Sequence, residues 1–131
     1  MIAVDTNVLV RLLTRDDDDQ ARRAQALFDA SSPKDGALFV LDIVLAEVCW
    51  TLERSYNRSR NDIARTIRAL LDNSTLRLES AAAVEAALML FEAGNSGFPD
   101  CLIVTKARQA GCISTVTFDR RMGGLPGIKM L

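Results

Sequence analysis

Short apolar runs alternate along the chain with segments in which apolar residues recur at helical spacing. The apolar runs predict strands at residues 1–4, 37–41, 76–78, 113–116 and 128–130. The periodic segments between them predict helices at residues 8–13, 20–28, 43–56, 61–72, 81–93 and 99–110. This alternation predicts an α/β fold, a three-layer α/β/α sandwich with a mostly parallel central sheet. No repeat or linker interrupts the pattern, so we expect a single domain over residues 1–131.

The first predicted strand ends in a polar tip. Its apolar residues lead directly into Asp5, Thr6 and Asn7, and a helix is predicted to follow at once. In open α/β sheets, ligands bind at the carboxyl ends of the strands. Asp5 is therefore expected at the place where the chemistry occurs.

Composition and charge set bounds on the function. With 16 basic and 17 acidic residues the chain has a net charge of −1, which argues neither for nor against a nucleic-acid partner. No apolar run approaches the roughly 18 residues that span a membrane, and the N-terminus lacks a secretion signal. We therefore expect a cytoplasmic protein with no membrane partner. The three cysteines lack the C-x-x-C spacing, and small buried hydrophobic residues are the expected role.

The chain contains no histidine. This excludes Ser-His-Asp triads, Cys-His dyads and zinc sites with histidine ligands, so acid–base or metal chemistry must fall mainly to carboxylates. Most of the acids have a simple structural explanation. Asp42 is expected to cap a helix, and the acidic run at residues 16–19 is expected to cap the helix that follows it. The acids that remain are Asp5, Glu47, Asp100 and Asp119.

These four acids lie in apolar surroundings. Glu47 is the only charge between Ile43 and Leu52, and an ionised carboxylate in such a setting is costly unless it is paired or bound to a metal. A buried arginine partner is the alternative explanation for Glu47. Asp100 also fits a helix-start acid, and Asp119 also fits a turn acid at the end of a strand.

Taken together, the four acids predict a metal site. Asp5 and Asp119 are expected at the carboxyl ends of two strands, Asp100 at a helix N-terminus and Glu47 on a helix facing the same edge. Ligation by oxygen alone favours Mg²⁺ or Mn²⁺. A carboxylate cluster of this kind suits hydrolysis of a phosphodiester, in which metals activate water and neutralise the phosphate.

The motifs around these acids resemble those of the PIN domain family in order and spacing. The matching segments are Asp5-Thr-Asn-Val-Leu, Ala46-Glu47-Val, Phe98-Pro-Asp100-Cys-Leu-Ile and Thr115-Val-Thr-Phe-Asp119. More narrowly, the chain is similar to the VapC family, the ribonuclease toxins of bacterial type II toxin–antitoxin pairs. The resemblance covers nearly the whole chain.

The resemblance implies a metal-dependent endoribonuclease with an acidic quartet. Mapped onto this sequence, the quartet is Asp5, Glu47, Asp100 and Asp119, binding Mg²⁺ or Mn²⁺ and hydrolysing RNA. We expect Asp5 and Asp100 to coordinate the main metal, with Glu47 and Asp119 as further ligands or water-positioning acids. The family also implies a homodimer and a cognate VapB-type antitoxin whose C-terminal segment wraps the toxin.

Polar support residues are implied at two further positions. Asn7 matches a polar residue near the first acid, and Thr117 matches a Ser or Thr before the fourth. One departure concerns the segment after the fourth acid, where many relatives carry a further acid and an aromatic residue, whereas Arg120-Arg121-Met122 stands here. Arg11 and Arg120 are candidates for contacts to RNA phosphates. Solvated surface arginines are the alternative.

Two other functions are alternatives to the ribonuclease. An aspartate-nucleophile phosphatase also has an Asp at the end of its first strand. It needs a second acid two residues later, where this chain has Asn7, and a lysine near the later acids, where Lys106 is badly placed. The other alternative is a domain that keeps the fold and only binds a partner. Four converging acids argue against it, because binding alone does not need them.

Overall fold

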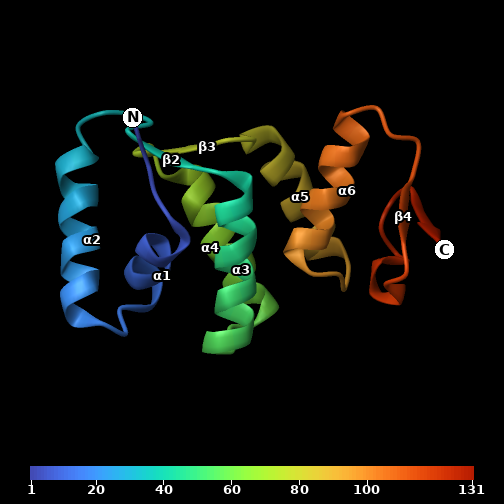
Figure 1. Cartoon of the computed structure of the whole chain (residues 1–131), viewed down its shortest axis with the longest axis horizontal. Helices are drawn as coiled ribbons and strands as arrows, with labels where there is room; N and C mark the ends of the chain where they lie inside the picture. The colour runs from blue at the N-terminus through green and yellow to red at the C-terminus, as the bar shows by residue number, and fades with distance from the viewer. The chain divides into compact units, whose positions relative to one another are not determined.

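The computed structural model describes residues 1–131 and divides the chain into two compact units, Met1–Ser80 and Ala81–Leu131. The predicted α/β class is confirmed, because helices alternate with short strands and every strand pairing is parallel (Figure 1). The strands form a three-stranded sheet in the first unit and a two-stranded sheet in the second, where one sheet was expected. An apolar pattern identifies strands but does not fix which strands pair. The single-domain organisation stays a prediction.

The first unit contains a parallel sheet in the order β1-β2-β3 and four helices. Its elements are β1 (Ile2–Ala3), α1 (Thr6–Thr14), α2 (Asp18–Ser31), β2 (Leu38–Val40), α3 (Asp42–Tyr56), α4 (Arg60–Asp72) and β3 (Leu76–Leu78). The central strand β2 pairs with β1 at Ile2↔Leu38 and with β3 at Leu38↔Leu76. The apolar residues 1–4 would suit a buried strand, but the side chain of Ile2 is exposed. The reason is that β1 is an edge strand of this sheet.

Three of these helices have a polar side chain as N-cap, and in each case its oxygen accepts a hydrogen bond from a backbone N–H of the first turn. Asp5 caps α1, Asp17 caps α2 by accepting a hydrogen bond from the backbone N–H of Gln20, and Ser59 caps α4. The expected cap of α3 is different. Leu41 occupies the N-cap position without a side-chain bond, and Asp42 lies in the first turn, where its carboxylate accepts a hydrogen bond from the Ser80 hydroxyl.

The core of the first unit lies where the helices meet each other and the sheet. Helix α1 packs against both α2 and α3, and α4 packs against α3 and β3. The side chains at these contacts are almost fully buried apolar groups, which the helical periodicity places on one face of each helix. They include Leu9, Leu45, Val48, Leu52 and Ile67 on the helices, and Leu38 on β2 is buried with them.

The second unit is built on a helix pair. Its elements are α5 (Ala81–Ala93), α6 (Phe98–Gln109), β4 (Thr115–Thr117), the 3₁₀ turn η1 (Arg120–Met122) and β5 (Ile128–Met130). Helices α5 and α6 pack along each other. Phe91 and Phe98 meet edge to face between them, with ring centroids 6.1 Å apart and planes at 85°. Strands β4 and β5 pair in parallel, with Thr115 opposite Ile128.

Strand β4 begins two residues later than predicted. The apolar pattern placed a strand at residues 113–116, but Ile113 is 98% exposed and precedes the ladder. The backbone bond that opens the ladder is donated by Thr115 to the carbonyl of Gly127. Gly111, with φ +93°, turns the chain out of α6, so the intervening residues belong to a turn although one of them is apolar.

Two of the cysteines have the buried role expected of them. Cys49 and Cys101 are buried free thiols, whereas Cys112 is exposed. Burial raises the pKa of the Cys49 thiol to about 12, with a smaller contribution from the charge of Glu53. No helix in the structure has the length and apolar character needed to cross a membrane.

The opposite faces of α3 give a test of this packing. Leu45 is buried and Ile43, two residues earlier, is 66% exposed. We expect Leu45→Ala to lower the free energy of unfolding by about 2–5 kcal/mol, because it removes buried methyl groups and leaves a cavity. Ile43→Ala is the matched control and should change it by no more than about 0.5 kcal/mol. Urea denaturation followed by circular dichroism measures both, and equal effects would contradict the assigned orientation of α3.

Candidate active site

Asp5 lies at the junction between the first strand and the first helix, as predicted. Val4 continues the pairing of β1 by donating to the carbonyl of Phe39, and Asp5 is the N-cap of α1. Its Oδ1 accepts a hydrogen bond from the backbone N–H of Thr6 at 2.7 Å. The carboxylate is exposed. It is therefore held at the helix start and remains accessible from solvent.

Glu47 lies in the middle of α3, and its surroundings differ from the expectation. We predicted an apolar setting that would make the charge costly, but Glu47 is exposed. The reason is that two of its apolar helical neighbours, Ile43 and Trp50, are themselves exposed. The Oε2 atom accepts a hydrogen bond from the hydroxyl of Thr6 at 3.2 Å. Because the Glu47 carboxylate is solvated, its charge does not require an arginine partner to offset a cost of burial.

A groove between α1 and α3 brings together three of the predicted site residues. Asp5, Asn7 and Glu47 all line it, and its volume is about 420 Å³. The rest of the lining is mainly hydroxyl and polar groups, contributed by Thr6, Arg11, Thr51, Ser55 and Tyr56, with Val10. Thr6 was not among the predicted site residues, although its place next to Asp5 was a usable signal, and it joins Asp5 and Glu47 in this lining. We call this hollow the α1–α3 groove.

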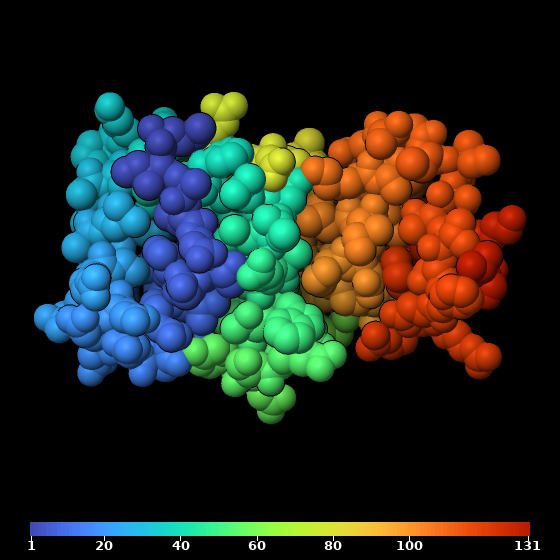
Figure 2. Space-filling model, in the orientation of Figure 1, coloured from blue at the N-terminus to red at the C-terminus, as the bar shows by residue number.

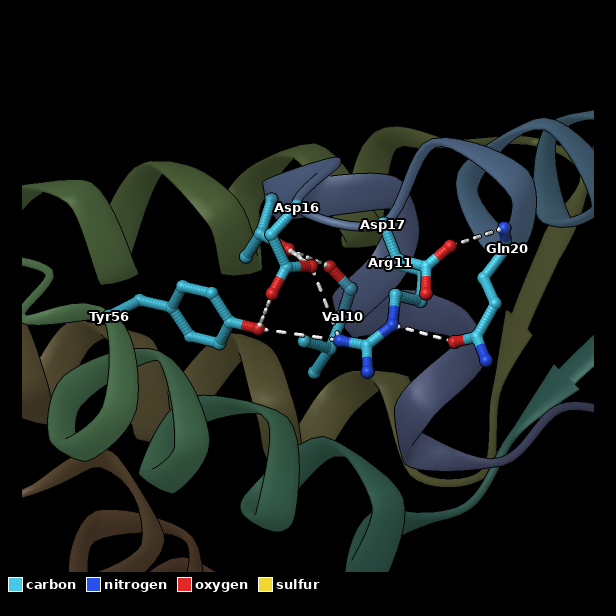
Figure 3. Close-up of polar contacts among 7 residues, drawn as sticks. Val10, Arg11, Asp16, Asp17, Gln20 and Tyr56 are labelled. Carbon is cyan, nitrogen blue, oxygen red and sulfur yellow. Dashed lines mark hydrogen bonds and ion pairs between the residues drawn. The ribbon is translucent and has the colours of Figure 1, made fainter.

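A polar network joins Arg11 and Tyr56, two residues that line the α1–α3 groove, to Asp16 and Gln20 (Figure 3). The guanidinium of Arg11 donates from Nε to Gln20 at 2.7 Å, and from Nη1 to Asp16 at 3.2 Å and to the Tyr56 hydroxyl at 3.3 Å. The Tyr56 hydroxyl donates to the other oxygen of Asp16 at 2.5 Å. Arg11 is thus half-buried and bonded rather than a solvated surface arginine. Its contact to phosphate stays a prediction.

Asp16 is the centre of this network. It was expected to share in capping α2, but Asp17 makes the cap and Asp16 instead accepts from Tyr56, Thr14 and Arg11. The hydrogen bond from Tyr56 is the main reason that the pKa of Asp16 lies below its usual value, and the bond from Thr14 and the charge of Arg11 act in the same direction. No sequence pattern links Asp16 with Tyr56, because the contact is formed only by folding.

The other two predicted acids lie in the second unit. Asp100 is half-buried in the first turn of α6, directly after Pro99. Asp119 is the N-cap of η1 and accepts hydrogen bonds from the backbone N–H and the guanidinium of Arg121. These bonds hold the pKa of Asp119 below its usual value. Asp119 thus has the turn role that was its alternative explanation.

Thr117 supports the backbone that carries Asp119. Its hydroxyl oxygen accepts a hydrogen bond from the backbone N–H of Asp119 at 2.9 Å. Arg120 is exposed, and it is the next residue, Arg121, that pairs with the acid. Each unit thus carries two of the four predicted acids. No three carboxylate, cysteine or histidine side chains form a metal-binding group in the structure, and the four-carboxylate site stays a prediction.

Comparisons with known proteins were made for the whole chain. The family model described as "PIN domain" matches residues 2–127. The chain is 29% identical over 121 residues to the "VapC ribonuclease" of Aquifex aeolicus (strain VF5), a match that covers 92% of this chain and 89% of that protein. A solved structure described as "Toxin-antitoxin complex from Klebsiella pneumoniae" matches 98% of this chain and 96% of its own, with 21% identity and a TM-score of 0.40.

The Tyr56–Asp16 bond gives a prediction with a defined pH dependence. Tyr56→Phe removes the main cause of the lowered pKa, so we expect the pKa of Asp16 to rise toward 3.8 in a carboxyl NMR titration. A group with a lowered folded pKa stabilises the fold above its unfolded pKa and loses this effect as the pH falls through the folded value. The melting temperature of Tyr56→Phe should therefore be lower than that of the wild type at neutral pH. The difference should begin to shrink as the pH falls below 3.8 and should disappear once the pH is below the lowered folded pKa of Asp16.

A double-mutant comparison isolates this bond. In an Asp16→Asn background the hydroxyl of Tyr56 no longer faces a carboxylate, so Tyr56→Phe should have a smaller effect on the melting temperature. An equal effect of Tyr56→Phe in both backgrounds would show that the hydroxyl acts elsewhere.

Proposed function

The chain belongs to the PIN domain family, and from this premise we propose that it is a VapC-type ribonuclease, the toxin of a toxin–antitoxin pair. The observation that carries the proposal is the likeness to a protein named VapC ribonuclease over 92% of the chain. The chemical groups that line the α1–α3 groove also support the ribonuclease proposal. Two exposed carboxylates line a polar, solvent-accessible hollow there, which is the environment that phosphate-ester hydrolysis requires.

The residues of the proposed site fit a hard divalent cation. The donors available in the α1–α3 groove are carboxylate and hydroxyl oxygens, and the chain has no histidine to favour zinc. Such a donor set suits Mg²⁺ or Mn²⁺. We propose that Asp5 and Glu47 are ligands of the cation, and that Asp100 and Asp119 are the remaining acids of the quartet that the family resemblance implies. The cation would neutralise charge at the scissile phosphate and make a coordinated water more acidic.

The protein's own groups would fix the geometry of these ligands. The hydroxyl of Thr6 holds the Glu47 carboxylate, and the backbone of Thr6 holds that of Asp5. One residue therefore orients two proposed ligands, so that little reorganisation is needed when the substrate binds. We propose that Asn7 hydrogen-bonds to the substrate or to water in the groove, and that Thr117 supports Asp119 from its backbone.

The proposal extends to the protein's surroundings. We propose RNA as the substrate, a VapB-type antitoxin as the cognate partner, a homodimer as the assembly and the cytoplasm as the location. We also propose one PIN domain spanning residues 1–131, in agreement with the match of the family model to residues from both units.

Removal of one carboxylate tests the proposed chemistry. Asp5→Asn should reduce Mg²⁺-dependent cleavage of RNA by about 100-fold or more, the loss typical when one electrostatic group of a catalytic site is removed. Asparagine keeps the capping ability of this position, so the fold should be unaffected. The measurement is the initial rate of cleavage of a labelled RNA, and Glu47→Gln is expected to behave in the same way.

The control for this experiment is Asp72→Asn, which removes an exposed acid at the end of α4. It should leave the rate at the wild-type value. A chelator should stop cleavage by the wild type, and added Mg²⁺ or Mn²⁺ should restore it. Full activity of Asp5→Asn, or cleavage that persists in chelator, would contradict the proposed site.

The antitoxin can be tested separately from the chemistry. We expect a small reading frame next to the gene to encode the antitoxin, and co-expression with its product should yield a stable complex in which RNA cleavage is suppressed. Asp5→Asn should form the same complex, because the fold is retained. If the protein cleaves RNA but the neighbouring product does not bind it, the ribonuclease stands and the toxin–antitoxin assignment fails.

A further inference from the structure

One face of α3 carries an exposed row of side chains. Ile43, Glu47, Trp50 and Arg54 follow one another at intervals of four, three and four residues, which places them within a sector of about 60° on an α-helix. All four are exposed, and the residues that α3 buries lie on its other side. Figure 2 shows that α3 reaches the surface of the first unit. We call these four residues the α3 row.

Trp50 and Arg54 form a pair within the α3 row. The Cζ atom of Arg54 lies 5.3 Å from the centroid of the indole ring, within the range of a cation–π contact. Trp50 is nevertheless 54% exposed. The arginine restricts the freedom of the indole without covering it, so an aromatic surface is already partly ordered and open to solvent.

Charge changes sign along this surface. Glu47, a proposed metal ligand, lies one turn before Trp50. In the other direction lies Arg54, which follows the exposed Glu53 in the chain and precedes the exposed Arg58 and Arg60, both beyond the end of α3. Within the α3 row a polyanion would be repelled at Glu47 and attracted at Arg54, with the indole between the two.

We propose that Trp50 and Arg54 form a subsite for a base and a phosphate of single-stranded RNA, next to the proposed active site. This inference rests on the proposed ribonuclease function. In it, a base stacks on the indole of Trp50, and the adjoining phosphate contacts Arg54 and the arginines that follow. An aromatic side chain flanked by arginines is the arrangement with which proteins bind single strands.

The chemistry of the α3 row favours RNA over a protein partner. The centre of a protein–protein interface is depleted of charge, whereas Trp50 has a carboxylate on one side and a guanidinium on the other. Single strands are favoured over duplexes because a duplex keeps the faces of its bases stacked on one another. A single exposed tryptophan is common on surfaces. The inference therefore depends on its position between Glu47 and the arginines.

The tryptophan itself reports on this subsite, because it is the only one in the chain. The full-length protein is titrated in chelator, which prevents cleavage, with a 12-nucleotide single-stranded RNA and with the same sequence as a duplex. Stacking should quench the fluorescence of Trp50 with the single strand. The duplex and inorganic polyphosphate, which offer charge without accessible bases, should leave it nearly unchanged.

Variants separate stacking from charge. Trp50→Leu should weaken binding of the labelled single strand by about 5- to 150-fold, the range of one base–aromatic stack, and Trp50→Phe should restore most of it. Arg54→Gln should weaken binding and reduce the salt dependence by about one phosphate contact. Met89→Ala, at an exposed apolar position of α5, and Arg22→Gln, on α2, are the matched controls and should bind as wild type.

The outcomes discriminate between the possible occupants of the α3 row. Unchanged RNA binding by Trp50→Leu overturns the subsite. If the same variant also changes the sedimentation coefficient of the protein, the α3 row is instead a surface for contact between protein chains. If the wild type cleaves RNA while Trp50 is not quenched, the subsite fails and the ribonuclease stands. If Trp50 is quenched while no cleavage occurs with Mg²⁺ or Mn²⁺, the subsite stands and the proposed function fails.

Discussion

The packing of helix α1 against helix α3 is the contact on which the candidate site in the first unit depends. Leu9 and Val10 on α1, and Leu45 and Val48 on α3, are buried. Because a helix is rigid over this length, burying one face of each fixes where the start of α1 and the middle of α3 lie. Two carboxylates that are distant in sequence thereby line one groove.

Hydrogen bonds add to this apolar packing. Packing of interdigitating side chains sets both the distance and the orientation of the two helices. Hydrogen bonds then link particular polar groups of α1 to α3, from Thr6 to Glu47 and from Arg11 to Tyr56. These four polar side chains line the α1–α3 groove.

Local patterns predicted the elements well and the surroundings of their side chains less well. Helical periodicity and turn residues located all six helices, and the position of Asp5 between strand and helix followed from residues next to it in the chain. The burial of Glu47 was wrong because apolar neighbours were taken to mean an apolar environment, although Ile43 and Trp50 face solvent. The bond between Asp16 and Tyr56 could not be predicted, since it joins segments that meet only after folding.

The capping role of Asp5 has a consequence for the history of such proteins. Its Oδ1 begins helix α1, so selection for a stable fold acts on this position independently of catalysis. Asparagine caps a helix about as well as aspartate, whereas alanine does not. A lineage that loses the activity but keeps the fold can therefore drift from aspartate to asparagine here at little cost.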